Sequence, residues 1–572
     1  MITEHEIGGI PVLHAPSTGP MHAGLVFRVG LVDEPLARRG ITHLIEHLAL
    51  HSIGAADYHY NGATGSEFTY FHMRGAEADV VTFLNGVCAA LRDLPIQRLA
   101  VEKEILRTEQ NSRDDSAAEV MALWRHGAVG YGTAAYPEWG LAGITADDLN
   151  AWTSRYFTRG NAALWIAGSG VPDGLDLSLP DGDRQPVPPP ASALPVRPAW
   201  FPGRSNVVAW SAVVPRGPGA AVFAGVLERA LFRSLRQESG LSYTVKADHS
   251  ARADGNTVIT AFADSLPEKF GAVLGAFVDV LAAMRLGLID EADVRTVVKR
   301  RADEATEAAE IGARLPGQVF NLLTGRPVEK SDDEFAARLR AVGREDVVAI
   351  AATAIADGLL MTPGDHRGDW AGFTAAPTTS DTRVDGTTRQ RLGYRASDEP
   401  EVALTIGPDG VSLVRDGAPV TVRFDQVAIV LAWPDGARLL IGRDALQVHF
   451  EPTLYPDAAA VTTAIDAAVG PESRVMLPAR DPESIPVPVS APPPPSLGQR
   501  ARRLAGRSRL VLSMLVYGAF ALLLGVGTVT GAAESLNEGD VFIGLGVGAG
   551  GLAFTGLFGR FAVGAFRELR ES

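Results

Sequence analysis

The segment Thr42–Gly54 reads "THLIEHLALHSIG" and places three histidines and one glutamate in an otherwise apolar run. On a helix, His43 and His47 lie four residues apart on one face, so both imidazoles can reach one metal ion. Glu46 lies between them, close enough to act on a water bound to that ion without being a ligand. This order, H-x-x-E-H, is the inverse of the zincin motif. His51 continues the same face by one turn, and we interpret it as an ordinary polar helix residue.

A hydrolytic zinc site needs a third protein ligand and one open position. The segment "LAVEKEILRTEQN" (residues 99–111) supplies Glu102 and Glu109 seven residues apart, which is two turns along one helix face. We expect Glu109 to be the third ligand and Glu102 to orient a ligand by hydrogen bonding. The prediction is one Zn²⁺ per chain. Without the histidines, both glutamates would be read as solvated surface residues.

The composition limits the classes of protein to which the whole chain can belong. Its 572 residues predict several domains, and 46% hydrophobic residues predict that most of it is globular. The net charge of -15 argues against a general nucleic-acid binder. Cys88 is the single cysteine, which excludes an intrachain disulfide and a cysteine-based zinc cage. The first residues show neither a secretory nor a transit pattern.

Proline-rich or polar segments divide the chain. We interpret 179–198, 378–393 and 481–498 as linkers between bodies at 1–178, 199–377, 394–480 and 499–572. The first two bodies repeat one pattern of strand, helix, strand and helices, which begins with "AGLVFRVGLV" in one and "NVVAWSAVV" in the other. The expected fold class is α+β, with two tandem homologous α/β sandwich domains.

The third body alternates short β-rich runs with turn signals and ends in one helical run. This order fits a small barrel of the pleckstrin-homology (PH-like) type, and an unassigned small β-rich domain fits equally well. Both interpretations stay open at this point.

The last body contains two uncharged apolar segments, at about 510–533 and 541–559, that predict a transmembrane hairpin. The alternative is a buried pair of core helices. Arginines flank both segments, so the positive-inside tendency places both ends, and residues 1–498, in the cytosol. We therefore expect an integral protein of a bacterial cell membrane, with lipid contacts at the hairpin and its basic flank.

Several segments in order, over about residues 8–375, resemble the inverzincin peptidases of the pitrilysin, insulin-degrading and mitochondrial-processing type (M16), particularly their members with two domains per chain. The matching segments are the H-x-x-E-H helix, "NGATGSEFTYF" (61–71), Glu102 with Glu109, the stretch 131–161, and Arg236 with Tyr243 in "LRQESGLSY". The spacing around 47–61 is shorter than usual, Gly62 and Gly65 replace bulkier residues, and Tyr136 replaces the usual histidine before Pro137.

The resemblance implies a zinc metalloendopeptidase for small or unfolded peptides, with Glu46 as the general base. It implies substrate contacts by Arg236, Tyr243, Asn61 and Thr64, and peptide addition along an edge strand at 66–74. It also implies a homodimer, or pairing with an M16 paralogue, in which the zinc half of one chain closes on the second half of another. The alternative function is a non-catalytic, membrane-anchored peptide-binding or scaffold subunit that partners an active M16 peptidase.

Overall fold

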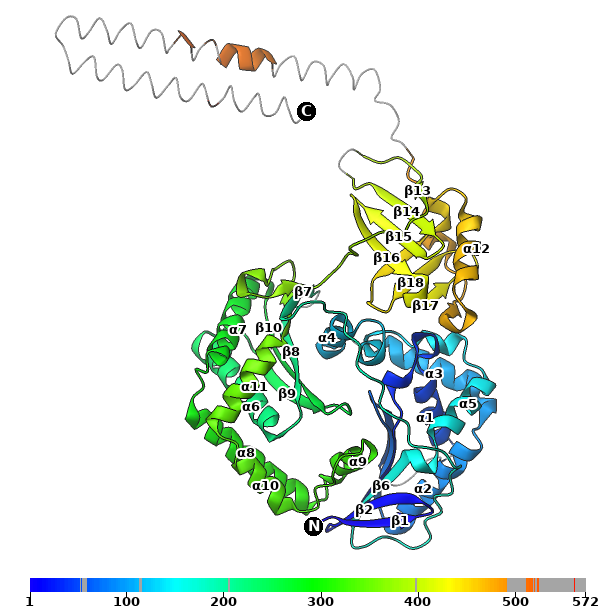
Figure 1. Ribbon diagram of the computed structural model, residues 1–572, viewed down its shortest axis with the longest axis vertical. Helices are drawn as coiled ribbons and strands as arrows, with labels where there is room; N and C mark the ends of the chain where they lie inside the picture. Colours follow the sequence, from blue (N-terminus) through cyan, green and yellow to red (C-terminus); the bar gives the residue numbers. More distant parts are fainter. Residues whose placement is uncertain are drawn as a thin grey trace, which may run out of the picture. The chain divides into compact units, whose positions relative to one another are not determined.

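The computed structural model describes most of the chain up to residue 490 and a few residues beyond it. The described residues are 1–51, 53, 59–112, 116–203, 206–396, 399–490, 511–517, 519, 522–523 and 560. The chain divides into two compact units, Met1–Pro488 and Val489–Ser572. The helices and strands labelled in Figure 1 all lie in the first unit.

No helix among the described residues is long and apolar enough to cross a membrane. The second predicted span, 541–559, lies outside the described residues. The first, 510–533, is described only at 511–517, 519, 522 and 523. The hairpin therefore stays a prediction from the sequence.

The first half of the first unit is built on a six-stranded sheet of order β1-β2-β6-β3-β5-β4. Its strands are β1 (Thr3–Ile7), β2 (Ile10–Pro16), β3 (Met21–Phe27), β4 (Tyr60–Thr64), β5 (Thr69–Gly75) and β6 (Ala162–Gly168). Strand β6, "AALWIAG", is apolar without alternation because both of its faces are buried. The helices of this half are α1 (Ile41–His51), α2 (Glu77–Arg92), α3 (Leu99–Asn111), α4 (Ala117–His126) and α5 (Ala146–Tyr156).

The second half repeats this design. Its sheet has the order β12-β7-β11-β8-β10-β9, in which β7 and β11 pair in parallel as β2 and β6 do. The strands are β7 (Ala199–Gly203), β8 (Val207–Pro215), β9 (Val245–Ala251), β10 (Asn256–Asp264), β11 (Leu359–Pro363) and β12 (Thr374–Ala375). The helices are α6 (Pro218–Phe232), α7 (Phe270–Arg285), α8 (Glu291–Glu310), α9 (Leu315–Leu323), α10 (Asp332–Arg340) and α11 (Arg344–Ala356). The mixed α/β fold expected from the repeat is observed.

The two halves share buried contacts. Helix α9 of the second half packs on β6 of the first, where Leu315 and Val319 join Trp165 in one cluster (Figure 1). Arg125 of α4 donates to the Asp357 carboxylate at 2.7 Å, and its guanidinium is almost completely buried. A buried charge needs such a partner, so this ion pair ties α4 of the first half to the second half.

The third body consists of two four-stranded sheets and one helix around a common core. Strands β13 (Thr387–Gln390), β14 (Val402–Gly407), β15 (Gly410–Arg415) and β16 (Ala418–Arg423) form one sheet. Strands β17 (Val427–Ala432), β18 (Arg438–Gly442), β19 (Gln447–Phe450) and β20 (Arg474–Met476) form the other, and α12 is Ala458–Ala468. Strand β13 falls inside the segment 378–393 that was interpreted as a linker, and it pairs with β14. The PH-like assignment stays a prediction.

Candidate metal centre

Helix α1 presents the H-x-x-E-H residues on a helix whose other face is anchored in the core. The anchoring side chains are Ile41, Leu44, Ile45 and Leu48. His43 and His47 lie on the opposite side, where about a fifth of each side chain is exposed (22% and 21%). The buried Glu34 carboxylate accepts hydrogen bonds from the N–H groups of Gly40 (3.0 Å) and Thr42 (2.9 Å). These bonds satisfy amides that have no partner within the helix at its start.

His43, His47 and Glu109 form the candidate metal cluster. One ligand atom from each lies within 4.8 Å of the other two. The Nε2 atoms of His43 and His47 lie 3.9 Å and 3.6 Å from Glu109 Oε2. Zinc ligands at about 2.0–2.2 Å in tetrahedral geometry are about 3.3 Å apart, which the two His–Glu109 distances exceed by about 0.3–0.6 Å. The donor set therefore fits zinc.

The far nitrogens of both imidazoles face carboxylates. His43 Nδ1 lies 3.1 Å from Glu138 Oε1, and His47 Nδ1 lies 3.5 Å from Glu102 Oε2. A carboxylate only accepts, so each Nδ1 carries the proton and each Nε2 keeps its lone pair for a metal. Arg98 in turn donates to Glu102 at 3.0 Å. Carboxylates behind ligating histidines are the usual support of zinc sites.

Glu46 lies beside the cluster and is 4% exposed. Thr64 of β4 donates from Oγ1 to Glu46 Oε2 at 2.7 Å. A Cβ on Gly62 would lie 2.8 Å from Glu46 Cγ, so the glycine makes room for this side chain. Asn61 lies exposed on the same strand. The structure thus brings Thr64 into contact with Glu46 beside the cluster, whereas Asn61 lies three residues earlier on the same strand.

The predicted edge strand was wrong. We expected the segment 66–74 to form the edge, but β5 (Thr69–Gly75) lies inside the sheet between β3 and β4. Among the described strands the edge is β4, which pairs with β5. The H-x-x-E-H helix packs against this same edge strand. Residues 52 and 54–58, within the short interval before it, lie outside the described residues.

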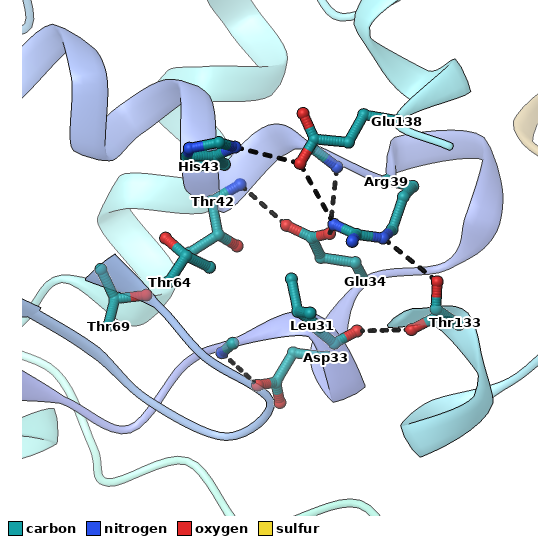
Figure 2. A network of polar contacts seen from close by, with 12 residues as sticks. Leu31, Asp33, Glu34, Arg39, Thr42, His43, Thr64, Thr69, Thr133 and Glu138 are labelled. Carbon is teal, nitrogen blue, oxygen red and sulfur yellow. Dashed lines mark hydrogen bonds and ion pairs between the residues drawn. The ribbon is translucent and has the colours of Figure 1, made fainter. Parts of the chain in front are cut away.

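A buried network that the sequence did not reveal supports His43 (Figure 2). The Arg39 guanidinium lies 3.3 Å from Glu34 Oε2 and 3.4 Å from Glu138 Oε1. Its Nε donates to the backbone oxygen of Thr133 at 3.3 Å. Arg39 therefore pairs with two carboxylates. One is Glu34, which caps α1, and the other is Glu138, which lies behind His43. No local spacing indicates this, because Glu138 is 95 residues from His43 in the chain.

The pKa shifts in the centre reflect burial and the neighbouring charges, and burial and His43 lower the pKa of His47. Burial raises the pKa of Glu46, and Glu109 and Glu138 raise it further, against the opposing effects of His43 and Thr64. Burial acts to lower the pKa of His43, but its carboxylate neighbours outweigh burial and raise it. Such an environment favours a divalent cation.

Arg236 and Tyr243 lie together, outside the lining of the cavity beside the cluster. The Arg236 guanidinium lies 4.9 Å from the centroid of the Tyr243 ring, and Tyr243 is 76% exposed. The cavity beside the cluster, about 130 Å³, is lined by His43, Glu109 and Glu138 among others, and neither Arg236 nor Tyr243 lines it.

Comparisons with known proteins agree on the fold. No family model matches the chain. An uncharacterized zinc protease of Streptomyces coelicolor is 26% identical over 392 residues, which cover 59% of this chain and 83% of the relative.

Two solved structures are similar at TM-score 0.55. A protease from Helicobacter pylori is 16% identical over 64% of this chain and 99% of its own. A peptidase M16 inactive domain from Pseudomonas fluorescens is 14% identical over 64% of this chain and 98% of its own. At these identities the structures show the fold, and one of them is named as inactive. The chain therefore has the mixed α/β fold of M16 peptidases.

Proposed function

We propose that this protein is a zinc metalloendopeptidase that hydrolyses peptide bonds in small or unfolded peptides. One observation carries the proposal: two imidazole Nε2 atoms face Glu109 while carboxylates hold both Nδ1 atoms, and a buried glutamate lies beside them. The name of the Streptomyces coelicolor relative supports the same activity.

His43, His47 and Glu109 would hold a zinc ion, which would supply a Lewis acid and activate a water for attack. Glu46 takes the proton of the attacking water and passes it to the leaving amine. Thr64 holds the Glu46 carboxylate in place for both transfers through its 2.7 Å hydrogen bond.

The substrate binds along β4. An extended peptide can add to the edge strand of a sheet through main-chain hydrogen bonds, which tolerate many sequences. The edge strand Tyr60–Thr64 ends at the residue that bonds Glu46, so a peptide on this edge passes the base. Asn61 and Thr64 are the predicted substrate contacts on this strand.

A second chain completes the site in this proposal. Arg236 and Tyr243 are exposed as a stacked pair outside the cavity of the cluster, which suits contact with the substrate of another chain. The partner is a second copy of this chain or an M16 paralogue. For the homodimer, mixing inactive Glu46→Gln and Tyr243→Phe chains should restore activity in one of the two composite sites. Mixtures that stay inactive would contradict sharing between copies.

We propose that the C-terminal segment anchors the protein in a bacterial cell membrane, with the peptidase part on the cytoplasmic side. The apolar segments 510–533 and 541–559 and their flanking arginines support this. Carbonate-resistant sedimentation of the full chain with membranes, lost on truncation at residue 498, is the expected result.

The experiment that tests the activity uses the full chain. We expect zinc at one equivalent and cleavage of a quenched peptide library by wild type, with cleavage lost in Glu46→Gln and kept in Glu104→Gln. Glu104 is a matched control because it lies exposed on α3, paired with Arg107. Unchanged cleavage by Glu46→Gln would refute the mechanism. Zinc binding and peptide binding without cleavage would instead favour the non-catalytic scaffold, the function suggested by an inactive structural neighbour.

A further inference from the structure

We propose that Glu138 is a positioning residue for the metal ligand His43, and that the β-rich domain holds Glu138 in place. This inference rests on the proposed zinc site and adds a role for the third body, which lies outside the peptidase resemblance. It implies that the β-rich domain contributes indirectly to metal binding.

Glu138 lies in a short turn between two 3₁₀ helices, Gly130–Ala135 and Trp139–Ala142. Its carboxylate reaches His43 Nδ1 at 3.1 Å (Figure 2), and its backbone N–H donates to Gln110 Oε1 at 2.9 Å. Gln110 follows the predicted ligand Glu109 on α3. The turn is therefore hydrogen-bonded to α1 and to α3, the two helices that carry the predicted metal ligands. A displacement of the turn would change its contacts with both helices.

The outer side of this turn packs on the β-rich domain. Tyr136 and Trp139, which flank Glu138, belong to one apolar cluster with the segment before Arg39 and with three strands. The buried members from the strands are Ile429 and Leu431 of β17, Ile441 of β18 and Val475 of β20, and those before Arg39 are Leu36 and Ala37. The cluster thus packs behind Arg39 and Glu138, which contact each other beside His43.

The sheet that contains β17 and β18 buries both of its faces. Side chains alternate between faces along a strand, and Val430 and Leu440 point into the domain's own core while Leu431 and Ile441 point to the other cluster. The outer face of this sheet is therefore covered by the zinc-binding half rather than by water. An isolated β-rich domain would expose it.

A backbone contact fixes the same junction. The N–H of Ala128 donates to the Arg443 carbonyl at 2.9 Å. Gly127 has a φ of +74°, and a Cβ there would lie 2.0 Å from that carbonyl oxygen. The close approach requires glycine, so the chain is adapted to this docking immediately before the segment that leads to Glu138.

The test measures zinc affinity of the metal-free full chain by competition with a chromophoric chelator. Removing a carboxylate behind a ligating histidine costs about 10–100-fold in metal affinity, so we expect that loss in Glu138→Gln. Glu104→Gln should bind zinc as wild type does. Unchanged affinity in Glu138→Gln would overturn the positioning role, whether or not the protein cleaves peptides.

The role of the β-rich domain is tested by Leu431→Ala, alone and combined with Glu138→Gln. If the docking acts through Glu138, Leu431→Ala weakens zinc binding in wild type and adds nothing in the Glu138→Gln background. Leu227→Ala, the same truncation in the core of the second half, should leave zinc affinity unchanged. Additive losses in the double variant would overturn the link. A wild type without zinc affinity would remove the proposed function and this inference together.

Discussion

Replacing Thr64 by valine tests how the proposed base is held. Valine has nearly the same shape as threonine but lacks the hydroxyl that donates to Glu46 at 2.7 Å. Glu46 is 4% exposed, so little water can replace the lost donor. A hydrogen bond to a charged group contributes about 1.5–3 kcal/mol, which corresponds to about 10–150-fold in rate at 1.36 kcal/mol per tenfold. We expect Thr64→Val to lower kcat by that factor.

The assay compares kcat on one peptide that the wild type cleaves, together with the zinc content of each protein. Thr64→Ser is the matched variant, because it keeps the donor and loses only a methyl group, and it should stay close to wild type. Zinc content should be equal in all three proteins because Thr64 is not among the clustered ligands. Equal kcat for Thr64→Val and Thr64→Ser would refute the idea that this bond positions Glu46.

Three further changes probe other contacts. Gly62→Ala should displace Glu46 and lower kcat by about 100-fold at most, whereas Gly65→Ala, whose Cβ would lie 3.4 Å from its nearest neighbour, serves as the control. Asp33→Ala should lower the free energy of unfolding, measured with urea, by about 3–5 kcal/mol, because it leaves the buried Arg28 without its ion-pair partner. A loss under 1 kcal/mol would contradict this. Burial first, and then Arg252 and Arg125, lower the pKa of His126 to about 4, so the unfolded chain binds more protons below pH 6.5. The stability lost between pH 7.5 and 5 should therefore be about 2 kcal/mol smaller in His126→Asn than in wild type, because other groups titrate equally in both proteins.

The residues of the centre that the sequence revealed are those set by local periodicity. His43, Glu46 and His47 share one helix face, and Glu102 and Glu109 share another, so spacing alone placed each group before any tertiary contact was known. The structure brings these two helix faces together around one cluster.

The remaining contacts depend on long-range pairing that spacing does not encode. The strand β4 becomes the edge only through the order of the whole sheet, which is why the segment 66–74 was mistaken for it. Glu138 follows a proline in an irregular segment without any periodic pattern. Its role arises because α1 and the turn before Trp139 meet in the folded chain.

The docking of the β-rich domain did leave a trace in the sequence. A strand with one face in water alternates apolar and polar residues, whereas "VAIVLA" of β17 is apolar throughout, which indicates burial on both faces. This bears on any experiment with a truncated protein. A chain ending at residue 377 would expose Leu36, Tyr136 and Trp139, which the β-rich domain covers, and would free the turn that holds Glu138. We expect such a chain to bind zinc more weakly than the full chain even with every predicted ligand present. Inactivity of that truncated chain would therefore not by itself show the absence of a peptidase.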